Sequence, residues 1–413
     1  MIISQAFWPD TASVAQHMTD LAEEMVKKGH TIDVFSSRHA YENNKEVFPA
    51  DEDHHGISIR RIRTTGFGKK RIIGRLSDFL SFNVLLFLRM IRIRKGRYDM
   101  VLCTTSPPLV AYIAVRAALN RRIPFCYWAM DLQPELSIAS GLIKDGSPSA
   151  RTLTRIGNFI IKRSSFIFAL DTYMKDYLVR RGAAEKDVHV VPVWPVMEKV
   201  YEGERLANPF RIENGFAGKI VIMYSGNHSY VHPLDTLLQS ALDLRKEEDF
   251  LFVFIGGGVR KKDVTAFKEQ HGLTNIVQLP YQPRNNIHNS LGAADIQVVI
   301  MGDGQVGFTH PNKVYGAMFI GKPILYIGPS PSHITDILGT LEGNLSVIHG
   351  NASHLTGQLL NFGRLRPEEK EEIGRRNRQY AQQHFYPALL KDQMLEILET
   401  QIGVTKTNGP KNN

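Results

Sequence analysis

Short runs of β-branched and aromatic residues alternate with segments of helical period along the whole 413-residue chain. This alternation is typical of βα units, in which helices cross over between parallel strands and cover both faces of the sheet. After a first strand at the start of the chain, we predict strands at 31–35, 100–103, 124–128, 165–169, 188–191, 219–224, 250–255, 276–279, 296–300 and 323–327. The expected fold class is α/β, with two doubly wound, Rossmann-like domains.

The segment 192–218 separates the two sets of strands and is typical of an interdomain linker. It contains prolines, glycines and charged residues without clear periodicity. Because open α/β sheets bind ligands at the carboxyl ends of their strands, we expect a ligand cleft between the domains. We predict an N-terminal domain at 1–195, a C-terminal domain at 196–384, a helix at 385–402 that packs back on the N-terminal domain, and a disordered tail at 403–413.

The composition excludes several classes of protein. With 43% hydrophobic and 22% charged residues, the chain resembles a globular protein and not a disordered one. No apolar run approaches the roughly 18 residues of a membrane-spanning helix, and the first residues lack the features of a signal peptide. Cys103 and Cys126 lie in apolar runs, which favours reduced core thiols over a disulfide. We therefore expect a cytoplasmic protein.

The positive charge of the chain is concentrated in one segment. Residues 57–97 contain twelve Lys and Arg residues and one acid, a net charge of +11, although the whole chain carries only +9. An anionic neighbour is therefore expected at this segment. Nucleic acid is disfavoured as that neighbour, because aliphatic side chains outnumber stacking aromatics and no nucleic-acid-binding motif is present.

Apolar residues recur at helical spacing in the same segment, at Leu76, Phe79, Leu80, Val84, Phe87, Leu88 and Ile91. The stripe alone favours a helix that packs into the core of the N-terminal domain. The charge favours a membrane, because each basic residue near anionic lipid contributes about 1 kcal/mol. We predict peripheral binding to the inner face of the cell membrane through Arg71, Arg75, Arg89, Arg92, Arg94 and Lys95.

Three loops of the second domain share one property, a strand that runs through glycine into the start of a helix. The first contains Gly226 and Asn227, the second runs through Gly257 and Gly258 to Arg260 and Lys261, and the third contains Gly307, Pro311, Asn312 and Lys313. Unpaired N–H groups at helix starts bind anions, so together the loops are suited to cradle a diphosphate. Taken singly, each loop is more often only a tight connection. None matches the dinucleotide or P-loop motif, which disfavours a dehydrogenase or a nucleoside triphosphatase.

Metal and nucleophile sites have little support. The run 51–55 contains acids and two histidines, but a solvated loop is the better interpretation. His228 and His232 are four residues apart, yet Pro233 makes a shared helical face improbable. No Ser/His/Asp or Cys/His arrangement is recognisable by local spacing. We expect no metal and no cofactor.

The order of several motifs resembles glycosyltransferase family 4, a family with the GT-B fold, and in particular its bacterial polysaccharide branch of N-acetylfucosamine transferases. The resemblance covers nearly the whole chain and rests on these segments: 7–10 with 28–34, 104–109, 130–135, 311–315 and 321–323. It implies transfer of a sugar from a nucleotide-diphosphate donor, usually a UDP-sugar, with retention at the anomeric carbon and without a metal. Together with the membrane binding predicted for the basic segment, it leads us to expect a membrane-associated or lipid-linked acceptor for a surface glycan.

The resemblance implies roles for individual residues. Arg260 and Lys313, with Lys261, would stabilise the leaving diphosphate, and the loop 302–310 would lie over the donor sugar. Leu279 and Tyr281 would present backbone groups to the base. Asp131 would orient or deprotonate the acceptor hydroxyl, with Glu135 and Pro9 on the acceptor side. The alternatives are a turn or cap residue for Asp131 and a surface lysine for Lys313.

One departure from the family pattern concerns the donor ribose. The glutamate that binds the ribose in the family falls at Gly316 here, and its first acidic position falls at Phe308. Loss of a charged hydrogen bond costs about 1.5–3 kcal/mol. A different nucleotide, a ribose contact from elsewhere or a non-catalytic relative each remains open. Two alternatives to a transferase therefore stand: a nucleotide-sugar-binding homologue without activity, and a GT-B sugar-nucleotide epimerase.

Overall fold

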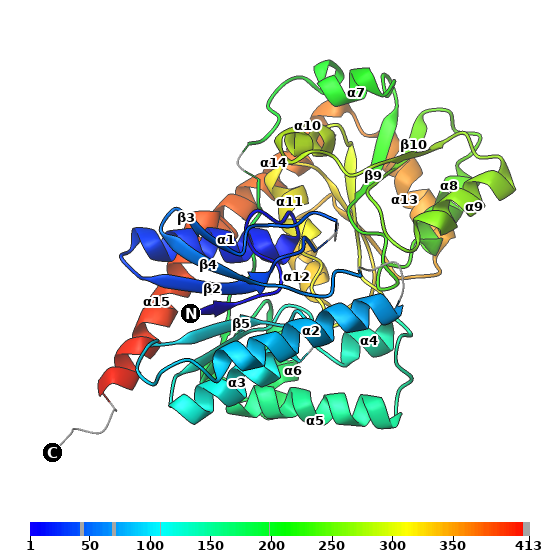
Figure 1. Cartoon of the computed structure of the whole chain (residues 1–413). Helices are drawn as coiled ribbons and strands as arrows, with labels where there is room; N and C mark the ends of the chain where they lie inside the picture. The colour runs from blue at the N-terminus through cyan, green and yellow to red at the C-terminus, as the bar shows by residue number, and fades with distance from the viewer. Residues whose placement is uncertain (42–44, 68–71, 108, 198, 408–413) are drawn as a thin grey trace.

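The structure is a computed structural model that describes residues 1–41, 45–67, 72–107, 109–197 and 199–407. It consists of two α/β domains, each built on one sheet (Figure 1). The predicted fold class is confirmed, and every predicted strand is present in the predicted order.

The N-terminal sheet has the strand order β3-β4-β2-β1-β5-β6-β7-β8. All neighbours pair in parallel except β3, which is antiparallel to β4. The inner strands are apolar and fully buried because helices cover both faces. The strands are β1 (Ile2–Ile3), β2 (Ile32–Ser37), β3 (Asp51–His54), β4 (Ile57–Ile62), β5 (Val101–Thr104), β6 (Phe125–Trp128), β7 (Phe166–Ala169) and β8 (Val188–Val190).

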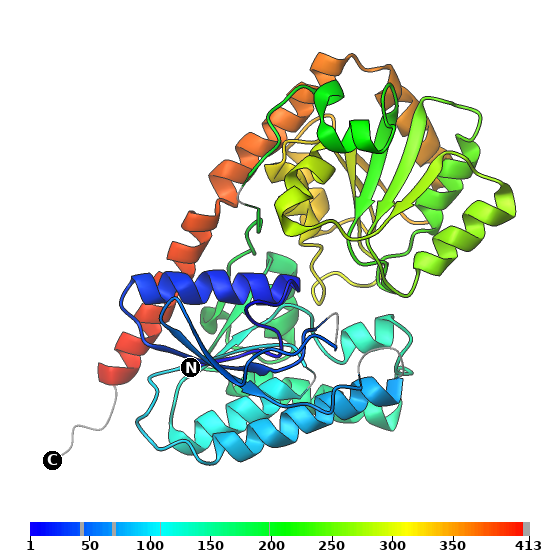
Figure 2. The ribbon, with the colours of Figure 1, turned by 45° about the horizontal axis from the view of Figure 1, so that its top comes forward.

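Helices cover the two faces of this sheet unequally. Figure 2 shows α2, α3 and α5 on one face and α1 on the other. Within the described residues, none of these or the other helices is long and apolar enough to cross a membrane. The helices are α1 (Ser13–Lys27), α2 (Ile72–Met90), α3 (Val110–Arg121), α4 (Glu135–Ala139), α5 (Pro148–Arg163) and α6 (Thr172–Arg180), with the 3-10 turn η1 (Glu185–Asp187).

The C-terminal sheet is parallel throughout, in the order β11-β10-β9-β12-β13-β14. Its strands are β9 (Ile220–Ser225), β10 (Phe250–Ile255), β11 (Ile276–Leu279), β12 (Ile296–Ile300), β13 (Ile324–Ile327) and β14 (Leu345–Val347). Its helices are α8 (Asp235–Asp243), α9 (Lys261–His271), α10 (Ile287–Gly292), α11 (Lys313–Phe319), α12 (His333–Gly339), α13 (Ala352–Arg364) and α14 (Pro367–His384), with η3 (Arg284–Asn286). The chain reverses its direction across the sheet between β9 and β12, which we call the switch point.

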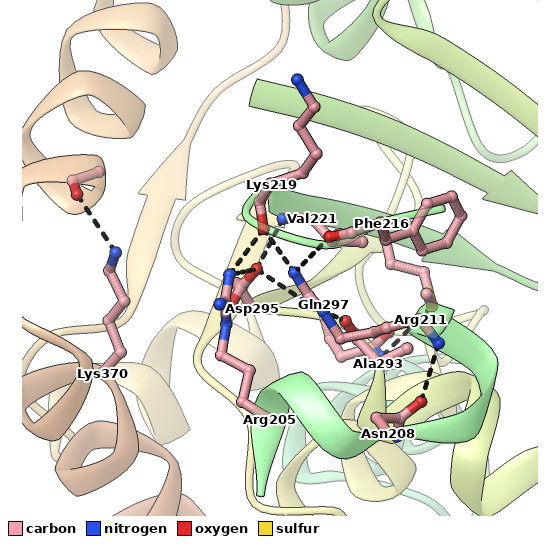
Figure 3. Close-up of polar contacts among 12 residues, drawn as sticks. Arg205, Asn208, Arg211, Phe216, Lys219, Val221, Ala293, Asp295, Gln297 and Lys370 are labelled. Atoms are coloured by element: carbon pink, nitrogen blue, oxygen red, sulfur yellow. Dashed lines mark hydrogen bonds and ion pairs between the residues drawn. The ribbon is translucent and has the colours of Figure 1, made fainter. Parts of the chain in front are cut away.

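The segment between the domains is more ordered than its composition suggests. It contains η2 (Arg205–Ala207) and α7 (Pro209–Glu213), and Phe210 and Phe216 are buried in the C-terminal domain. Arg211, 1% exposed, donates to Asp295 over 3.1 Å, and Arg205 forms a second ion pair with the same carboxylate (Figure 3). This buried network fastens the segment to the amino ends of β9 and β12, where Asp295 also accepts from the backbone N of Val221 over 2.7 Å.

The last helix, α15 (Pro387–Thr407), returns to the N-terminal domain and lies beside α1 (Figures 1 and 2). Ion pairs support this contact, with His30 to Glu399 at 2.9 Å and Lys391 to Glu24 at 3.7 Å. The helix extends to Thr407, so the prediction of a disordered tail from 403 is wrong for its first five residues. The remainder of that tail, 408–413, lies outside the described residues.

Candidate active site

The switch point of the C-terminal sheet brings together the loops that follow β9 and β12. Lys313, the first residue of α11, extends across this point to the β9 loop. Its Nζ donates to the Tyr224 hydroxyl over 2.7 Å and lies 3.8 Å from the centre of that ring. A Cβ atom at Gly226 would lie 2.5 Å from the Lys313 Cε, so any side chain there would displace the end of the lysine. Lys313 thus occupies the position where doubly wound sheets bind ligands.

Lys313 has no ion pair with a carboxylate among the described residues, and the surrounding protein atoms remove water from its ammonium group. This burial lowers the pKa of Lys313 to about 7. A cation at the start of a helix is also disfavoured by the helix dipole. An anion bound beside Nζ would relieve both penalties.

The glycine loop after β10 packs directly against the β9 loop. A Cβ atom at Gly256 would lie 2.2 Å from the Gly226 carbonyl oxygen, and one at Gly258 would lie 2.4 Å from the Asn227 Oδ1. Both glycines have positive φ, 127° and 129°. The backbones can therefore approach closely and leave N–H groups near the carboxyl ends of the strands.

The other predicted donor residues surround this loop. Lys261 Nζ donates to the Gly256 carbonyl over 3.2 Å, and the Tyr281 ring would lie 3.1 Å from a Cβ at Gly257. Leu279 ends β11 and accepts from Gly256 N over 3.0 Å. The structure thus brings Gly226, Asn227, Gly257, Gly258, Lys261, Leu279 and Tyr281 together around the ends of three strands.

Arg260, unlike Lys313, forms ion pairs with carboxylates that the structure describes. Its guanidinium donates to Asp263 over 2.8 Å and to Asp235 over 3.1 Å. Its charge is therefore balanced by two carboxylates at the starts of α8 and α9. The predicted catalytic role of Arg260 stays a prediction, and a ligand phosphate would have to compete with both acids.

Asp131 follows β6 on the N-terminal side of the site, and its backbone N lies 3.4 Å from the Thr105 Oγ1. Part of Asp131 remains exposed, but the protein atoms packed around its carboxyl group raise its pKa to about 6, and the nearby His310 opposes this rise. Glu135, in contrast, is paired within its own domain, with Arg181 and with the Tyr177 hydroxyl at 2.7 Å. Pro9 is exposed in the loop after β1.

The loop 302–312 of the C-terminal domain touches the N-terminal domain. Leu132 N donates to the Phe308 carbonyl over 2.9 Å, and the Gly307 backbone approaches the Tyr173 carbonyl so closely that a Cβ atom would lie 2.9 Å from it. A small pocket between the domains is lined by Asp171 and Tyr173 from one side and by Gly307, Thr309, Pro311 and His333, among others, from the other. Asp171, His333 and Tyr224 were not predicted as site residues, because the residues that they contact are distant along the chain.

The possible metal ligands are arranged differently from the sequence expectation. Residues 51–54 form β3 and not a loop. His54 Nε2 and His55 Nδ1 lie 2.8 and 3.3 Å from one Glu23 oxygen, and these three are the only candidate metal-binding group found among the described residues. Of the other pair, His228 Nδ1 lies 3.2 Å from the Gly257 carbonyl and His232 Nδ1 2.9 Å from the Ser229 hydroxyl.

The basic segment forms α2, and its apolar stripe does not form the core. Apolar side chains that are exposed here are Leu80, Val84, Leu85, Phe87, Leu88 and Ile91, whereas Phe82, Leu86 and Met90 are buried. Phe79 is half-buried, and the side chain of Leu76 lies outside the described residues. The core interpretation of the stripe is therefore wrong, because the buried face of α2 lies at different positions. Arg89, Arg92, Arg94 and Lys95 are exposed. Arg71 and the side chain of Arg75 lie outside the described residues.

Comparisons with known proteins agree with this architecture. Residues 13–194 match the family described as Glycosyl transferase 4-like domain. Probable glycosyltransferase WbjE of Pseudomonas aeruginosa is 27% identical over 265 residues, which cover 62% of this chain and 64% of that protein.

Solved structures resemble the whole chain. Anabaena Alr3699/HepE in complex with UDP and glucose superposes with a TM-score of 0.71 at 14% identity, covering 97% of this chain and 98% of that one. WaaG, a glycosyltransferase involved in lipopolysaccharide biosynthesis, superposes with a TM-score of 0.69 at 13% identity, covering 96% and 98%. Residues 13–194 are therefore similar to the glycosyl transferase 4-like domain, and the chain has the two-domain fold of the GT-B glycosyltransferases.

Proposed function

We propose that this protein is a retaining glycosyltransferase. It transfers a sugar from a nucleotide-diphosphate donor, a UDP-sugar, to a membrane-associated or lipid-linked acceptor in surface polysaccharide synthesis, without a metal. The observation that carries the proposal is Lys313, a half-buried lysine without a carboxylate partner in the described part of the chain, which lies beside two glycine loops at the switch point. The relation to WbjE, the UDP complex of HepE and the similarity to WaaG support the same reaction class.

The chemistry of the proposed reaction follows from charge. Departure of a nucleoside diphosphate leaves negative charge on the phosphate oxygens, which Lys313 and the loop N–H groups stabilise in place of a metal. Asp131 lies on the opposite domain, and with a pKa of about 6 it is ionised at neutral pH and can accept a hydrogen bond from an acceptor hydroxyl. The N-acetylfucosamine branch of the family stays a prediction about the donated sugar.

The direct experiment is thermal-shift screening of the protein against nucleotide sugars, followed by a UDP-release assay with and without acceptor lipid extracts. Acceptor-dependent UDP release supports the transferase. Binding without turnover indicates a binding module, the alternative that Gly316 favours, and interconversion of the free donor indicates an epimerase. Absence of any nucleotide binding would contradict all three.

The pKa of Lys313 predicts how donor affinity depends on pH. The free protein carries neutral Lys313 above about pH 7, whereas the bound diphosphate favours the charged form. Binding at pH 8 therefore takes up close to one proton, and the Kd for UDP-glucose rises up to about tenfold for each pH unit above 7. Isothermal titration calorimetry in two buffers of different ionisation enthalpy measures the uptake. Lys313→Met should remove it, and equal uptake by wild type and this variant would contradict the assignment.

Gly316 offers a gain-of-function test of the ribose position. Among the described residues, the atom that a Cβ there would meet is the Met197 Cε, at 3.7 Å, and the residue has no positive φ, so α11 accepts a Cβ at this position without a clash. If the ribose lies beside this helix, Gly316→Glu raises the affinity for UDP about tenfold or more. Gly316→Ala is the control, because it restores helix propensity without a carboxylate. Equal affinities of the two variants would place the ribose elsewhere.

The exposed face of α2 supports membrane association. It presents contiguous apolar side chains beside Arg89, Arg92, Arg94 and Lys95, the arrangement of a helix that lies in a bilayer surface. Arg92→Gln with Arg94→Gln should weaken partition onto anionic vesicles about 30-fold, since each charge contributes about 1 kcal/mol. Co-sedimentation with phosphatidylglycerol vesicles measures this effect. Neutralising the exposed Arg364 and Arg366 of the other domain is the matched control, and an equal loss in both variants would refute the role of α2.

A further inference from the structure

A chain of buried hydrogen bonds joins the two domains at the loop 302–312. His310 Nδ1 lies 2.6 Å from Asp171 Oδ2 of the N-terminal domain, and His310 Nε2 lies 2.7 Å from the Tyr315 hydroxyl. That hydroxyl lies 3.1 Å from the Nε2 of His333. The side chains of His310 and Asp171 are 0% and 4% exposed. The contact is therefore dry, and it is specific to the arrangement of domains seen here.

The carboxylate of Asp171 fixes the direction of the interdomain hydrogen bond. Burial opposes the ionisation of Asp171, but the hydrogen bond and charge of His310 hold its pKa below the usual value, so the residue is a carboxylate that can only accept. His310 Nδ1–H therefore donates to Asp171. The Tyr315 hydroxyl joins His310 Nε2 to His333 Nε2 within the C-terminal domain. The bond between His310 and Asp171 thus depends on the arrangement of the domains, whereas those of Tyr315 do not.

The two oxygens of Asp171 have separate partners. Oδ1 accepts from Met174 N over 2.7 Å and caps α6 whether or not the domains touch, whereas Oδ2 faces His310. If the domains separate, Asp171 Oδ2 and His310 Nδ1 lose their hydrogen bond to each other, whereas His310 Nε2 keeps Tyr315. The pair thus favours the closed arrangement without being required for the fold of α6.

His310 lies three residues before Lys313, which begins α11. Tyr315 is the third residue of that helix. The residues 310–313 connect the interdomain pair to the start of α11, which carries the cation of the site. On the other side, the Leu132 to Phe308 hydrogen bond ties the same loop to the residue that follows Asp131. One contact region therefore fixes the donor-side lysine relative to the acceptor-side aspartate.

We propose that Asp171 and His310 are a positioning pair that couples closure of the two domains to placement of the loop 302–312 over the donor. The inference rests on the proposed function, because it assigns this loop to the donor sugar. It predicts that loss of the pair lowers kcat and leaves nucleotide affinity nearly unchanged, since the glycine loops and Lys313 lie outside the pair.

Two substitutions at Asp171 separate positioning from capping. Asp171→Ser retains a good helix cap but is too short to reach His310. Asp171→Asn also caps, and its amide N–H can donate to His310 Nδ1 in the tautomer that carries the imidazole proton on Nε2. We expect Asp171→Ser to lower kcat about ten- to 100-fold with the Kd for UDP within about threefold. Asp171→Asn should remain within about threefold of wild type in both quantities.

The pair must also behave as a unit. His310→Ala should lower kcat as Asp171→Ser does, and the double variant should lose no more than either single variant. Additive losses in the double variant, or a tenfold weaker Kd for UDP in Asp171→Ser, would overturn the inference in favour of independent structural roles.

Domain closure is measured directly with spin labels at Thr152→Cys in α5 and Gln270→Cys in α9, because both native cysteines are buried. In the wild-type background, UDP should shorten and narrow the distance distribution. In Asp171→Ser, UDP should bind and leave the distribution broad. A wild-type background that binds no UDP would count against the proposed function itself. UDP binding with equal closure and equal turnover in both backgrounds would overturn only the positioning pair.

Discussion

Lys313→Met is expected to lower sugar transfer about 100-fold or more while the protein remains folded. Methionine retains the length and packing of the lysine beside Gly226 and the Tyr224 ring, but it carries no charge. The negative charge on the departing diphosphate grows toward the transition state. Loss of the lysine charge therefore lowers kcat more than it weakens binding of the intact donor. Steady-state UDP release with saturating donor measures the effect.

Two variants serve as controls for this result. Lys219→Met removes a cation from the amino end of β9 in the same domain. The Lys219 Nζ donates to the Glu248 carbonyl over 2.7 Å, far from the glycine loops, so this variant should leave turnover unchanged. Tyr224→Phe removes the hydrogen bond from Lys313 and the one that the hydroxyl donates to the Asn227 carbonyl, and it should cost less than the loss of the charge. Wild-type turnover in Lys313→Met would remove the lysine from the mechanism.

Asp295→Ala is expected to destabilise the C-terminal domain by about 3–5 kcal/mol. The substitution leaves the guanidinium of Arg211 buried without its carboxylate, and it also removes a partner of Arg205 and of the Val221 N–H. Removing one partner of a buried ion pair destabilises a protein by more than the intact pair stabilises it, because the remaining charge is left buried without water or a partner. The network in Figure 3 is thus a site where a single substitution has a large effect on stability.

Native-state hydrogen exchange of β9 and β12 is the suitable measurement, because the three tryptophans, at 8, 128 and 194, all precede the C-terminal sheet. Asp235→Ala is the matched control. Asp235 pairs with Arg260 at 3.1 Å, but its side chain is 73% exposed, so its loss should cost less than about 1 kcal/mol. If the two substitutions accelerate exchange equally, the buried network does not hold this domain together.

The fold was predictable because the strands that define it are apolar and continuous. Strands such as β10 and β12 are buried on both faces, so their sequences contain almost no polar residue. Three strands escaped prediction. β3 is an edge strand of acids and histidine, whose pattern is that of a loop, β4 contains two arginines, and β14 is an edge strand of three residues. The exposure of the apolar stripe in α2 was not predictable, because helical spacing alone does not say which face is buried.

The glycine loops of the site were predictable because their chemistry is local: a strand, one or more glycines and a helix start follow one another in sequence. The contacts that give the site its properties are not local. Tyr224 and Lys313 are 89 residues apart, and Asp171 and His310 are 139 residues apart. Arg260 likewise follows a glycine loop in sequence, but its direction is set by Asp235, which belongs to another helix.

We expect the switch point of the C-terminal sheet to bind a diphosphate through Lys313 and the glycine loops. A crystal structure of the protein with UDP-glucose is the decisive test. In that structure a phosphate oxygen should lie within about 3 Å of Lys313 Nζ, with the remaining oxygens facing the backbone N–H groups that follow β9 and β10. A diphosphate bound away from these loops, with Lys313 still hydrogen-bonded only to Tyr224, would contradict it.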